Sequence, residues 1–496
     1  MSAAFRAFAF LVFGLIPVLT FAQEQREQPN IIFAIADDWG WPHASAYGDP
    51  VVNTPTFDRI AADGVLFEHA FVSSPSCTPS RNAILTGQYH WRLGWGANLH
   101  SELDPKHVTY PNLLENAGYF TGHFRKSWGP GRLPDWKDHP NVHPAGRKYN
   151  SVDEFFEARP EGQPFCFWFG ASDPHRGYRL NSGAESGMYL SVIDLFDHFP
   201  DSETIRGDVA DYYFEVQRFD RELGDVLKRL EEMDELENTI VVVTGDHGMP
   251  FPRCKGNLYD SGARVPMAVM GFGVQGQGRV VTDFVSTTDL APTFLEMAGV
   301  DIPEAMTGNS WVNILRSGES GRIEEDRNHV FTGKERHVPC QEAPDYGGTP
   351  MRAIRTDDFL LIRNFEPDRW PAGTPDWENA TIRGVWLGDV DNGPTKTYMV
   401  ENRDLDDEHR LKYELSFGKR PEFELFDLQN DPGQLVNVAQ DTAYAETLKE
   451  LNDRLTAELE RTEDPRILGN GHEVFDTPAY YGSGPRHPDS RRQRNN

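Results

Sequence analysis

Residues 31–38 read IIFAIADD, an uninterrupted apolar run that ends abruptly in two acids. Residues 165–170 (FCFWFG) and 239–244 (TIVVVT) have the same apolar character. None of the three runs alternates polar with apolar residues, so both faces of each segment are expected to be covered. The three runs therefore predict buried parallel strands in a sheet that lies between two layers of helices.

Each predicted strand is followed by charged side chains. Asp37-Asp38 follows the first strand, Asp173-Pro174-His175-Arg176 the second and Asp246-His247-Gly248 the third. In open α/β sheets, ligands gather outside the carboxyl ends of the strands. We therefore expect these acids and histidines to form one site, and three carboxylates favour a hard cation such as Ca²⁺ or Mg²⁺.

Helical patterns separate the predicted strands. Thr54-Pro55 begins one helix, with a capping residue and then a proline in the first turn, and Gly64 ends it. Residues 211–233 place apolar side chains at steps of three and four, which predicts a long amphipathic helix, and residues 289–299 predict a shorter one. Strands alternating with helices predict a doubly wound α/β catalytic domain over residues 23–335.

The composition changes after residue 335 to short runs punctuated by Pro, Gly and Asp. The runs at 359–362 (FLLI) and 423–426 (FELF) predict antiparallel strands, and leucines at 448, 451, 455 and 459 predict a helix. We therefore expect a smaller α+β domain over residues 336–470. Residues 471–496 are assigned to a C-terminal tail that is frayed from about Gly482.

The chain is strongly acidic. Its 496 residues contain 48 Lys plus Arg against 77 Asp plus Glu, a net charge of −29. Such a chain does not attract a polyanion over a long range, so we expect no nucleic-acid partner. A small anion held in a local basic pocket remains compatible with this charge.

Residues 1–22 have the features of an export signal. Arg6 precedes an apolar run that reaches Phe21, and Thr20-Phe21-Ala22 resembles a cleavage site. The run is too short for a permanent membrane anchor, so a periplasmic or secreted protein is expected. The four cysteines are too few for a disulfide scaffold, and the sequence leaves open whether Cys254 and Cys340 pair.

Residues 77–81 read CTPSR and precede a predicted short helix over residues 82–86, which Gly87 closes. A side chain at the start of a helix faces free backbone N–H groups, which form an anion site. Arg81, one turn later, is expected to point back toward Cys77. An ordinary thiol in such a place would have a lowered pKa.

These motifs resemble the sulfatase family, whose signature is Cys-x-Pro-Ser-Arg followed shortly by Thr-Gly, here Thr86-Gly87. The resemblance extends from Pro29-Asn30-Ile31 to residues 424–428 (ELFDL). It implies an alkaline-phosphatase-like fold and conversion of Cys77 to formylglycine (3-oxoalanine) by a formylglycine-generating maturation enzyme. Residues 173–176, 249–262 and 351–355 are most similar to the sulfamidase-like branch and to bacterial polysaccharide sulfatases.

The resemblance also implies a metal site. Asp37, Asp38, Asp246, His247 and the modified Cys77 would hold Ca²⁺, with Mg²⁺ as the alternative. The family commonly has Asn at the position of His247.

Further residues receive catalytic roles from the same resemblance. Lys126 matches a lysine that contacts formylglycine and sulfate, although Trp128 stands near the place of the family's following histidine. Lys255 would hold the sulfate, Arg81 would offset its charge, and His175 would donate a proton to the leaving oxygen.

Two arginines are predicted to contact the substrate. Arg176 and Arg253 are candidates because a guanidinium fork suits sulfate and carboxylate oxygens.

The expected reaction is hydrolysis of sulfate esters on a sulfated oligo- or polysaccharide. One hydroxyl of hydrated formylglycine would attack sulfur, and deprotonation of the second would expel sulfate and restore the aldehyde. Three alternatives stay open: an N-sulfoglucosamine-type sulfamidase, a phosphate or phosphonate ester hydrolase on the same fold, and a non-catalytic sulfated-glycan-binding protein with unmodified Cys77.

Overall fold

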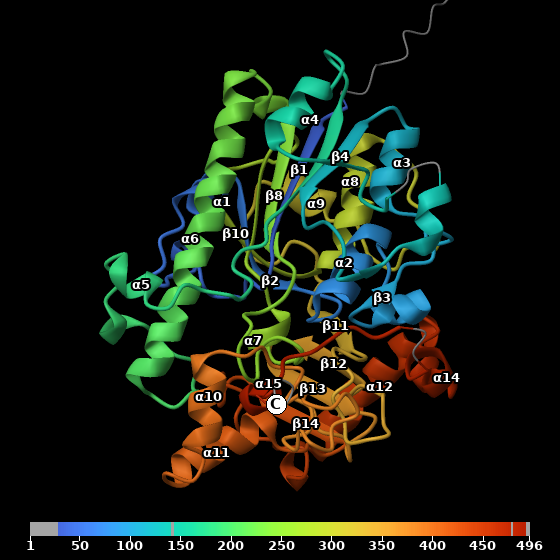
Figure 1. Cartoon of the computed structure of the whole chain (residues 1–496). Helices are drawn as coiled ribbons and strands as arrows, with labels where there is room; N and C mark the ends of the chain where they lie inside the picture. Colours follow the sequence, from blue (N-terminus) through green and yellow to red (C-terminus); the bar gives the residue numbers. More distant parts are fainter. Residues whose placement is uncertain (1–27, 140–142, 478–479, 493–496) are drawn as a thin grey trace, which may run out of the picture.

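The computed structural model describes residues 28–139, 143–477 and 480–492, so the predicted export signal lies outside the described residues. Figure 1 shows a large α/β part above and a smaller part, built from the last third of the chain, below it. Within the described ranges, no helix combines the length and the apolar character that crossing a membrane requires.

The large part is built on an eight-stranded sheet. Its strands lie side by side in the order β10 (Arg279–Ser286), β2 (Val65–Phe71), β9 (Met267–Gly271), β8 (Thr239–Gly245), β1 (Asn30–Ala36), β7 (Phe165–Gly170), β4 (Phe120–Arg125) and β6 (Arg147–Tyr149). The strands run parallel except for β9, which is antiparallel to β2 and β8. The three predicted strands are confirmed as the adjacent, parallel β8, β1 and β7.

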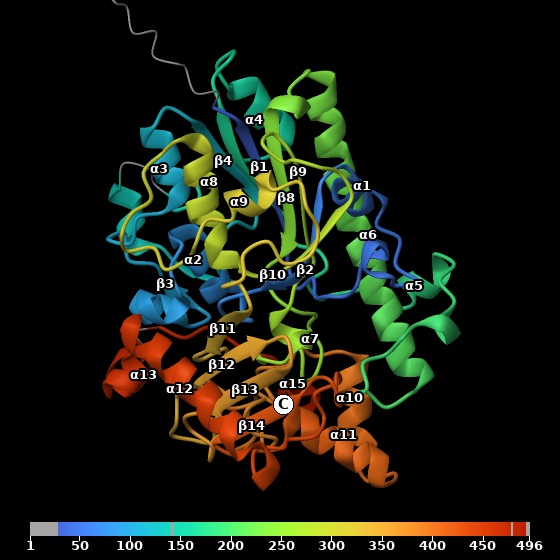
Figure 2. The same ribbon diagram turned by 180° about the vertical axis from the view of Figure 1, so that it is seen from behind.

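Both faces of this sheet are buried, as the unbroken apolar runs predict. Along β1, Ile32 and Ala34 pack into one core, and Ile31 and Phe33 pack into the other. One face is covered by α1 (Pro55–Asp63), α4 (Val152–Ala158) and α6 (Glu203–Glu232), and the other by α2 (Cys77–Thr86), α3 (Tyr110–Asn116), α8 (Leu290–Ala298) and α9 (Val312–Arg316). Figures 1 and 2 show these two helical layers from opposite sides.

The three helices predicted between the strands are confirmed, and one of them differs in length. Helices α1 and α8 lie where expected, and Gly299 caps α8 in the left-handed conformation. Helix α6 begins at Glu203, eight residues before the predicted start, because the side chain of Ser202 accepts a hydrogen bond from the backbone N–H of Ile205. This is the N-terminal cap of a helix whose buried residues extend back to Ile205.

The smaller part contains a four-stranded antiparallel sheet. Its strand order is β11 (His329–Lys334), β12 (Met351–Thr356), β13 (Phe359–Asn364) and β14 (Phe423–Asp427). The predicted strands and the leucine-rich helix, α12 (Ala445–Arg461), are present. Strand β11 lies inside the range expected for the catalytic domain, so the small sheet starts before residue 336.

Short elements connect or flank these two sheets. A two-stranded ribbon pairs β3 (Ser101–Glu102) with β5 (Gly131–Arg132). The remaining helices are α5 (Ser182–Glu185), α7 (Asp260–Ala263), α10 (Pro394–Glu401), α11 (Asp407–Phe417), α13 (Pro465–Leu468), α14 (Gly471–Phe475) and α15 (Pro488–Arg492).

The end of the chain differs from the frayed tail that its composition predicts. The backbone N–H of Trp386 donates to the carbonyl of Pro485 at 3.0 Å, and the N–H of His487 donates to Gly384 at 2.9 Å. The ring of His487 stacks on Trp377 with centroids 4.9 Å apart. Backbone pairing and ring stacking satisfy this polar segment, so its described part is held against the small domain.

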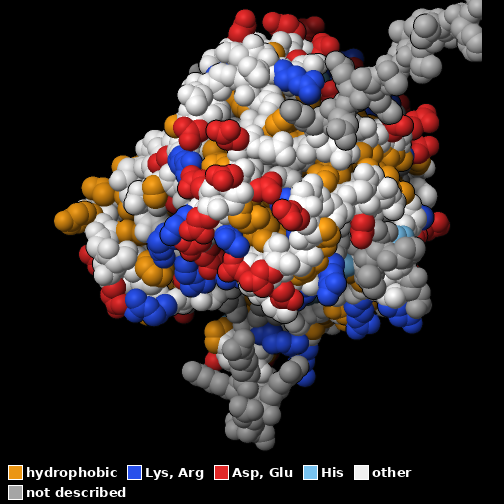
Figure 3. Space-filling model, turned by 90° about the horizontal axis from the view of Figure 1, so that it is seen from above, with side chains coloured by type: hydrophobic (Ala, Val, Ile, Leu, Met, Phe, Trp, Pro, Cys, Tyr) orange, Lys and Arg blue, Asp and Glu red, His pale blue; other side chains and the backbone are white. Residues whose placement is uncertain are grey.

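Charged side chains of both signs are scattered over the end of the large domain that faces away from the small one. Figure 3 shows acidic and basic groups interleaved there, and the described basic side chains of this view do not merge into one continuous surface.

A buried ion cluster supports the small domain, and it allows a stability prediction. Arg352 is fully buried, and its guanidinium donates to Asp464 at 2.5 Å and to Glu335 at 2.6 Å. Arg352→Ala leaves both carboxylates buried without this cation, so we expect a loss of about 3–5 kcal/mol in the free energy of unfolding.

Urea-induced unfolding measures this loss. Arg403→Ala is the matched control, because the Arg403–Asp404 pair is exposed and removing it should cost at most about 1 kcal/mol. Equal unfolding midpoints for the two variants would contradict a supporting role for the Arg352 cluster.

Candidate active site

The carboxyl ends of β8, β1 and β7 meet at one point because these strands are neighbours. The N–H of Asp246 donates to the carbonyl of Ala36 at 3.1 Å, and the N–H of Asp37 donates to Asp173 at 3.0 Å. The N–H of Asp38 donates to the Asp246 carboxylate at 2.9 Å. Residues far apart in the sequence are thus fixed side by side, as the strand-end pattern predicts.

Helix α2 brings Cys77 to this point. The helix begins at Cys77 itself, five residues before the predicted start at Asn82. The hydroxyl of Ser80 donates to the carbonyl of Asp246 at 2.6 Å and ties the first turn of the helix to the end of β8. The Cys77 Sγ lies 3.2 Å from His247 Nε2, so the signature cysteine contacts a strand-end histidine.

The pKa of the Cys77 thiol differs from the lowered value that a helix start predicts. Burial raises the pKa of Cys77 to about 11, and the carboxylates of Asp37 and Asp246 oppose ionisation as well. The positive charges of Lys126 and Lys255 favour the thiolate but do not outweigh burial. The unmodified thiol is therefore protonated and weakly nucleophilic at neutral pH.

Four side chains form a group able to hold a metal ion. The ligand atoms of Asp37, Cys77, Asp246 and His247 lie within 4.8 Å of one another, and all four residues are buried. Asp38 adjoins them, with Oδ1 3.2 Å from His247 Nε2. The Nδ1 of His247 donates to the carbonyl of Gly248 at 3.0 Å, which leaves Nε2 as a lone-pair donor toward the group.

Three cations balance the three aspartates of this group. Lys126 Nζ lies 2.5 and 2.6 Å from the two carboxylate oxygens of Asp37, and Lys255 Nζ lies 3.0 Å from both oxygens of Asp38. Arg81 Nε donates to Asp246 at 2.9 Å. Burial opposes ionisation of Asp37, but the charges of Lys126 and Arg81 hold its pKa well below the usual range.

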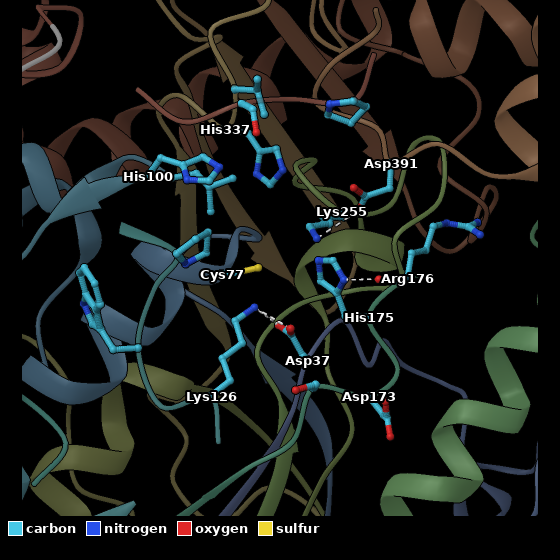
Figure 4. A pocket seen from close by; sticks show the side chains of 17 residues that line it. Asp37, Cys77, His100, Lys126, Asp173, His175, Arg176, Lys255, His337 and Asp391 are labelled. Carbon is cyan, nitrogen blue, oxygen red and sulfur yellow. Dashed lines mark hydrogen bonds and ion pairs between the residues drawn. The ribbon is translucent and has the colours of Figure 1, made fainter. Parts of the chain in front are cut away.

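The lysines face an open pocket, whereas Arg81 does not. A pocket of about 600 Å³ is lined by Cys77, Lys126, His175 and Lys255, and Figure 4 shows the two lysines and the histidine close to the cysteine sulfur. Arg81 is fully buried behind the aspartates, and its second donor group is bonded to the carbonyl of Lys126 at 2.6 Å. Its geometry suits holding the acids in place rather than touching a ligand in the pocket, and its role in offsetting the charge of a sulfate stays a prediction.

His175 offers one ring nitrogen to the pocket. Its Nδ1 donates to the carbonyl of Arg176 at 2.7 Å, and its Nε2 lies 4.0 Å from Asp38 Oδ2. The charge of Asp38 raises the pKa of His175 above the ordinary histidine value, against the opposing effect of burial. The imidazole is therefore well suited to carry a proton that it can release to a bound molecule.

Of the two predicted substrate arginines, Arg176 lines the pocket but its guanidinium is paired with an aspartate, and Arg253 lies elsewhere. The Arg176 guanidinium forms a two-pronged pair with Asp208 at 2.8 Å for each contact, and Figure 4 shows it pointing away from Cys77. Arg253 is buried, lies over the ring of Tyr259 at 3.7 Å and donates to the carbonyl of Leu415 at 2.6 Å. Arg253 lines a different cavity, so the structure does not bring it to the candidate site.

The pocket also includes residues that no sequence pattern indicated. They come from the small domain and from the end of the chain, and they include His337, Asp391, Ser483 and Pro485. His337 Nδ1 is 2.7 Å from the hydroxyl of Ser76, the residue before Cys77. These positions belong to loops of no fixed periodicity, so only the three-dimensional fold places them at the site.

The three cysteines other than Cys77 lie outside the candidate site. All four cysteines are free and buried, so Cys254 and Cys340 do not pair. Cys340 Sγ is 3.3 Å from Asp389, Cys254 Sγ is 3.7 Å from His198, and Cys166 lies in β7.

The fold and the pocket define an α/β enzyme whose nucleophile candidate lies among acids, lysines and a histidine. A family model described as "Sulfatase" matches residues 29–300, and a second model, "N-sulphoglucosamine sulphohydrolase, C-terminal", matches residues 245–371. The chain belongs to the sulfatase family, and it is a sulfuric ester hydrolase.

Individual relatives cover most of the chain. An ulvan-active sulfatase from Formosa agariphila is 27% identical over 86% of this chain and 74% of its own length. Human N-sulphoglucosamine sulphohydrolase is 28% identical over 88% of this chain and 91% of its own length. A solved structure in complex with its substrate, D-glucosamine-2-N,6-O-disulfate, superposes with a TM-score of 0.57 at 20% identity and covers 88% of this chain and 98% of the other, so it shares the fold.

Proposed function

We propose that this enzyme hydrolyses sulfate esters on a sulfated oligo- or polysaccharide, with Cys77 converted to formylglycine as the nucleophile. The observation that carries the proposal is the position of Cys77. It begins α2 between the Asp37–Asp246–His247 group on one side and a pocket with Lys126 and Lys255 on the other. A buried thiol with a pKa of about 11 is a poor nucleophile, which favours a modified side chain at this place.

Asp37, Asp38, Asp246, His247 and the oxygen of modified Cys77 would hold a divalent cation. Carboxylate oxygens suit Ca²⁺ or Mg²⁺, and the Nε2 lone pair of His247 faces the same point. The negative charges of the three aspartates cancel the positive charges of Arg81, Lys126 and Lys255. Without a bound cation, the site therefore has no excess positive charge to attract a sulfate. When bound, the cation supplies that charge and Lewis-acid polarisation of an oxygen.

The lysines and His175 would act on the substrate itself. Lys126 and Lys255 reach the pocket from opposite sides of Cys77, where they can offset negative charge on sulfate oxygens. Arg81 would position Asp37 and Asp246 from behind. His175 would donate its Nε2 proton to the leaving sugar oxygen, because its Nδ1 is bonded to a carbonyl.

A sulfated glycan is the proposed substrate class. The supporting relatives are an ulvan-active sulfatase, which matches 86% of this chain, and an N-acetylglucosamine-6-O-sulfatase, which matches 70%. N-sulfate hydrolysis is a second candidate, favoured by the match of residues 245–371 to the C-terminal model of N-sulphoglucosamine sulphohydrolase. We also propose export to the periplasm or the medium, with residues 1–22 as the signal, and maturation by a formylglycine-generating enzyme.

A substrate panel combined with intact-mass analysis tests the proposed function. Conversion of the Cys77 thiol to an aldehyde lowers the mass by about 18 Da. Protein with this mass should release sulfate from defined O-sulfated or N-sulfated oligosaccharides, and the panel separates the two. Unmodified Cys77 with glycan binding and no turnover would instead support a non-catalytic binding protein, and phosphonate ester cleavage without sulfate release would support the phosphonate alternative.

Metal removal gives a second prediction. Chelation should lower turnover by roughly 100-fold, because the ion stabilises transition-state charge by several kcal/mol. Elemental analysis of active enzyme should find a divalent ion, with Ca²⁺ expected over Mg²⁺, and re-addition of that ion should restore turnover. Active enzyme without an ion, or turnover unaffected by chelation, would overturn the assigned metal site.

A further inference from the structure

We propose that Asp391 selects the chemical group beside the sulfate. It accepts a hydrogen bond from a hydroxyl or amino group of the sugar and excludes a second anionic group at that position. The inference rests on the proposed function, because it takes the sulfate to lie between Cys77 and the two lysines.

Asp391 reaches the site from the small domain. It precedes α10, and its Oδ2 lies 3.2 Å from Lys255 Nζ. Its carboxylate also lies within 4.8 Å of ligand atoms of Asp38 and His175. Figure 4 shows the carboxylate directed into the pocket, toward Lys255, and its side chain is 23% exposed.

The loop that carries Asp391 is tied down on both sides. Lys396 Nζ donates to the carbonyls of Trp386, Leu387 and Val390 at 2.9, 3.1 and 2.8 Å and to Asn392 Oδ1 at 2.9 Å. Asp389 pairs with Lys334 at 2.6 Å, and both of these side chains are buried. Such anchoring holds a recognition group in place before a ligand binds.

The position of Asp391 relies on the same elements that position the proposed proton donor. Asp208 accepts hydrogen bonds from the N–H and hydroxyl of Thr395, the second residue of α10, and from Arg176, which adjoins His175. Asp391 and His175 are thus fixed relative to one another. Because His175 is proposed to act at the leaving oxygen and Lys255 at the sulfate, Asp391 faces the atoms next to that oxygen.

The chemistry of a carboxylate defines what it accepts. Aspartate is ionised at neutral pH and is then a hydrogen-bond acceptor without a donor. Lys255 occupies Oδ2, and among the described residues none donates to Oδ1. A hydroxyl or ammonium group of the substrate can fill this position, whereas a neighbouring sulfate or carboxylate is repelled.

Binding of small aryl sulfates tests the inference without knowledge of the natural sugar. The probes are 2-hydroxyphenyl sulfate and 2-carboxyphenyl sulfate, which place a donor or an anion beside the sulfated oxygen. Their Kd values are measured by calorimetry on Cys77→Ser protein, which retains the pocket. We expect a preference for the hydroxyl probe, and Asp391→Asn in the same background should reduce that preference roughly 10- to 100-fold.

Asp404→Asn in the same background is the matched control, because Asp404 forms an exposed pair with Arg403 and does not line the pocket. An unchanged ratio of the two Kd values in Asp391→Asn overturns the inference, as does the same change in Asp404→Asn. Turnover of phenyl sulfate by the mature enzyme reports separately on the proposed function. Failure of turnover with an Asp391-dependent Kd ratio would reject the reaction and retain the recognition role.

Discussion

Cys77→Ala is expected to lower turnover by on the order of 10⁴–10⁶-fold, the range for loss of a covalent nucleophile. Cys77 is 2% exposed at the first residue of α2, and an alanine fits its space, so the fold should be retained. Sulfate release at saturating substrate measures the effect. Circular dichroism and the unfolding midpoint show whether the variant is folded.

Cys166→Ala is the control for the loss of a buried thiol. Cys166 is the second residue of β7 and does not line the pocket, so its replacement should leave turnover within a few-fold of wild type. Cys77→Ser should be active only in a host whose maturation system accepts serine. Near-normal turnover by Cys77→Ala would refute the nucleophile assignment.

His175→Ala is expected to lower kcat much more for a sulfated sugar than for an activated aryl sulfate. A sugar alkoxide needs a proton to leave, whereas nitrophenolate leaves as a stable anion. Loss of the proton donor should therefore cost on the order of 10²–10⁴-fold in kcat on a sulfated sugar and much less on 4-nitrophenyl sulfate. Measuring kcat for both substrates with one enzyme preparation cancels differences in formylglycine content.

Lys255→Ala provides the comparison for His175. Lys255 is proposed to hold the sulfate, so its loss should affect the sugar and the aryl ester to a similar extent. Equal losses for His175→Ala on both substrates would assign His175 to sulfate binding or to support of Asp38. The proton donor would then be assigned to Lys255.

Much of the large domain could be predicted because its signals are local. The apolar runs that became β1, β7 and β8 have no polar face, and only a sheet covered on both sides buries them. Once these strands are neighbours, Asp37, Asp246 and His175 must meet at their carboxyl ends. The strand-end group could therefore be anticipated without coordinates.

Other expectations failed where burial or long-range packing decides the outcome. The helix-start argument for a lowered Cys77 pKa considers only local dipoles, whereas the surrounding core raises the pKa. Arg253 is two residues from Lys255 in the sequence, yet its side chain points into another cavity because the loop turns there at a positive φ of 63°. The polar end of the chain looked frayed but finds backbone partners in residues 384–386.

The sequence by itself determined the sheet, the strand-end acids and the cysteine signature, because each depends on residues adjacent along the chain. Only the tertiary structure decided which side chains form the pocket wall opposite Cys77. Asp391 lies 314 positions after Cys77 and comes from the small domain, and it reaches Lys255 because a network around Lys396 fixes its loop. Such contacts are set by the docking of two domains, which no local pattern of residues records.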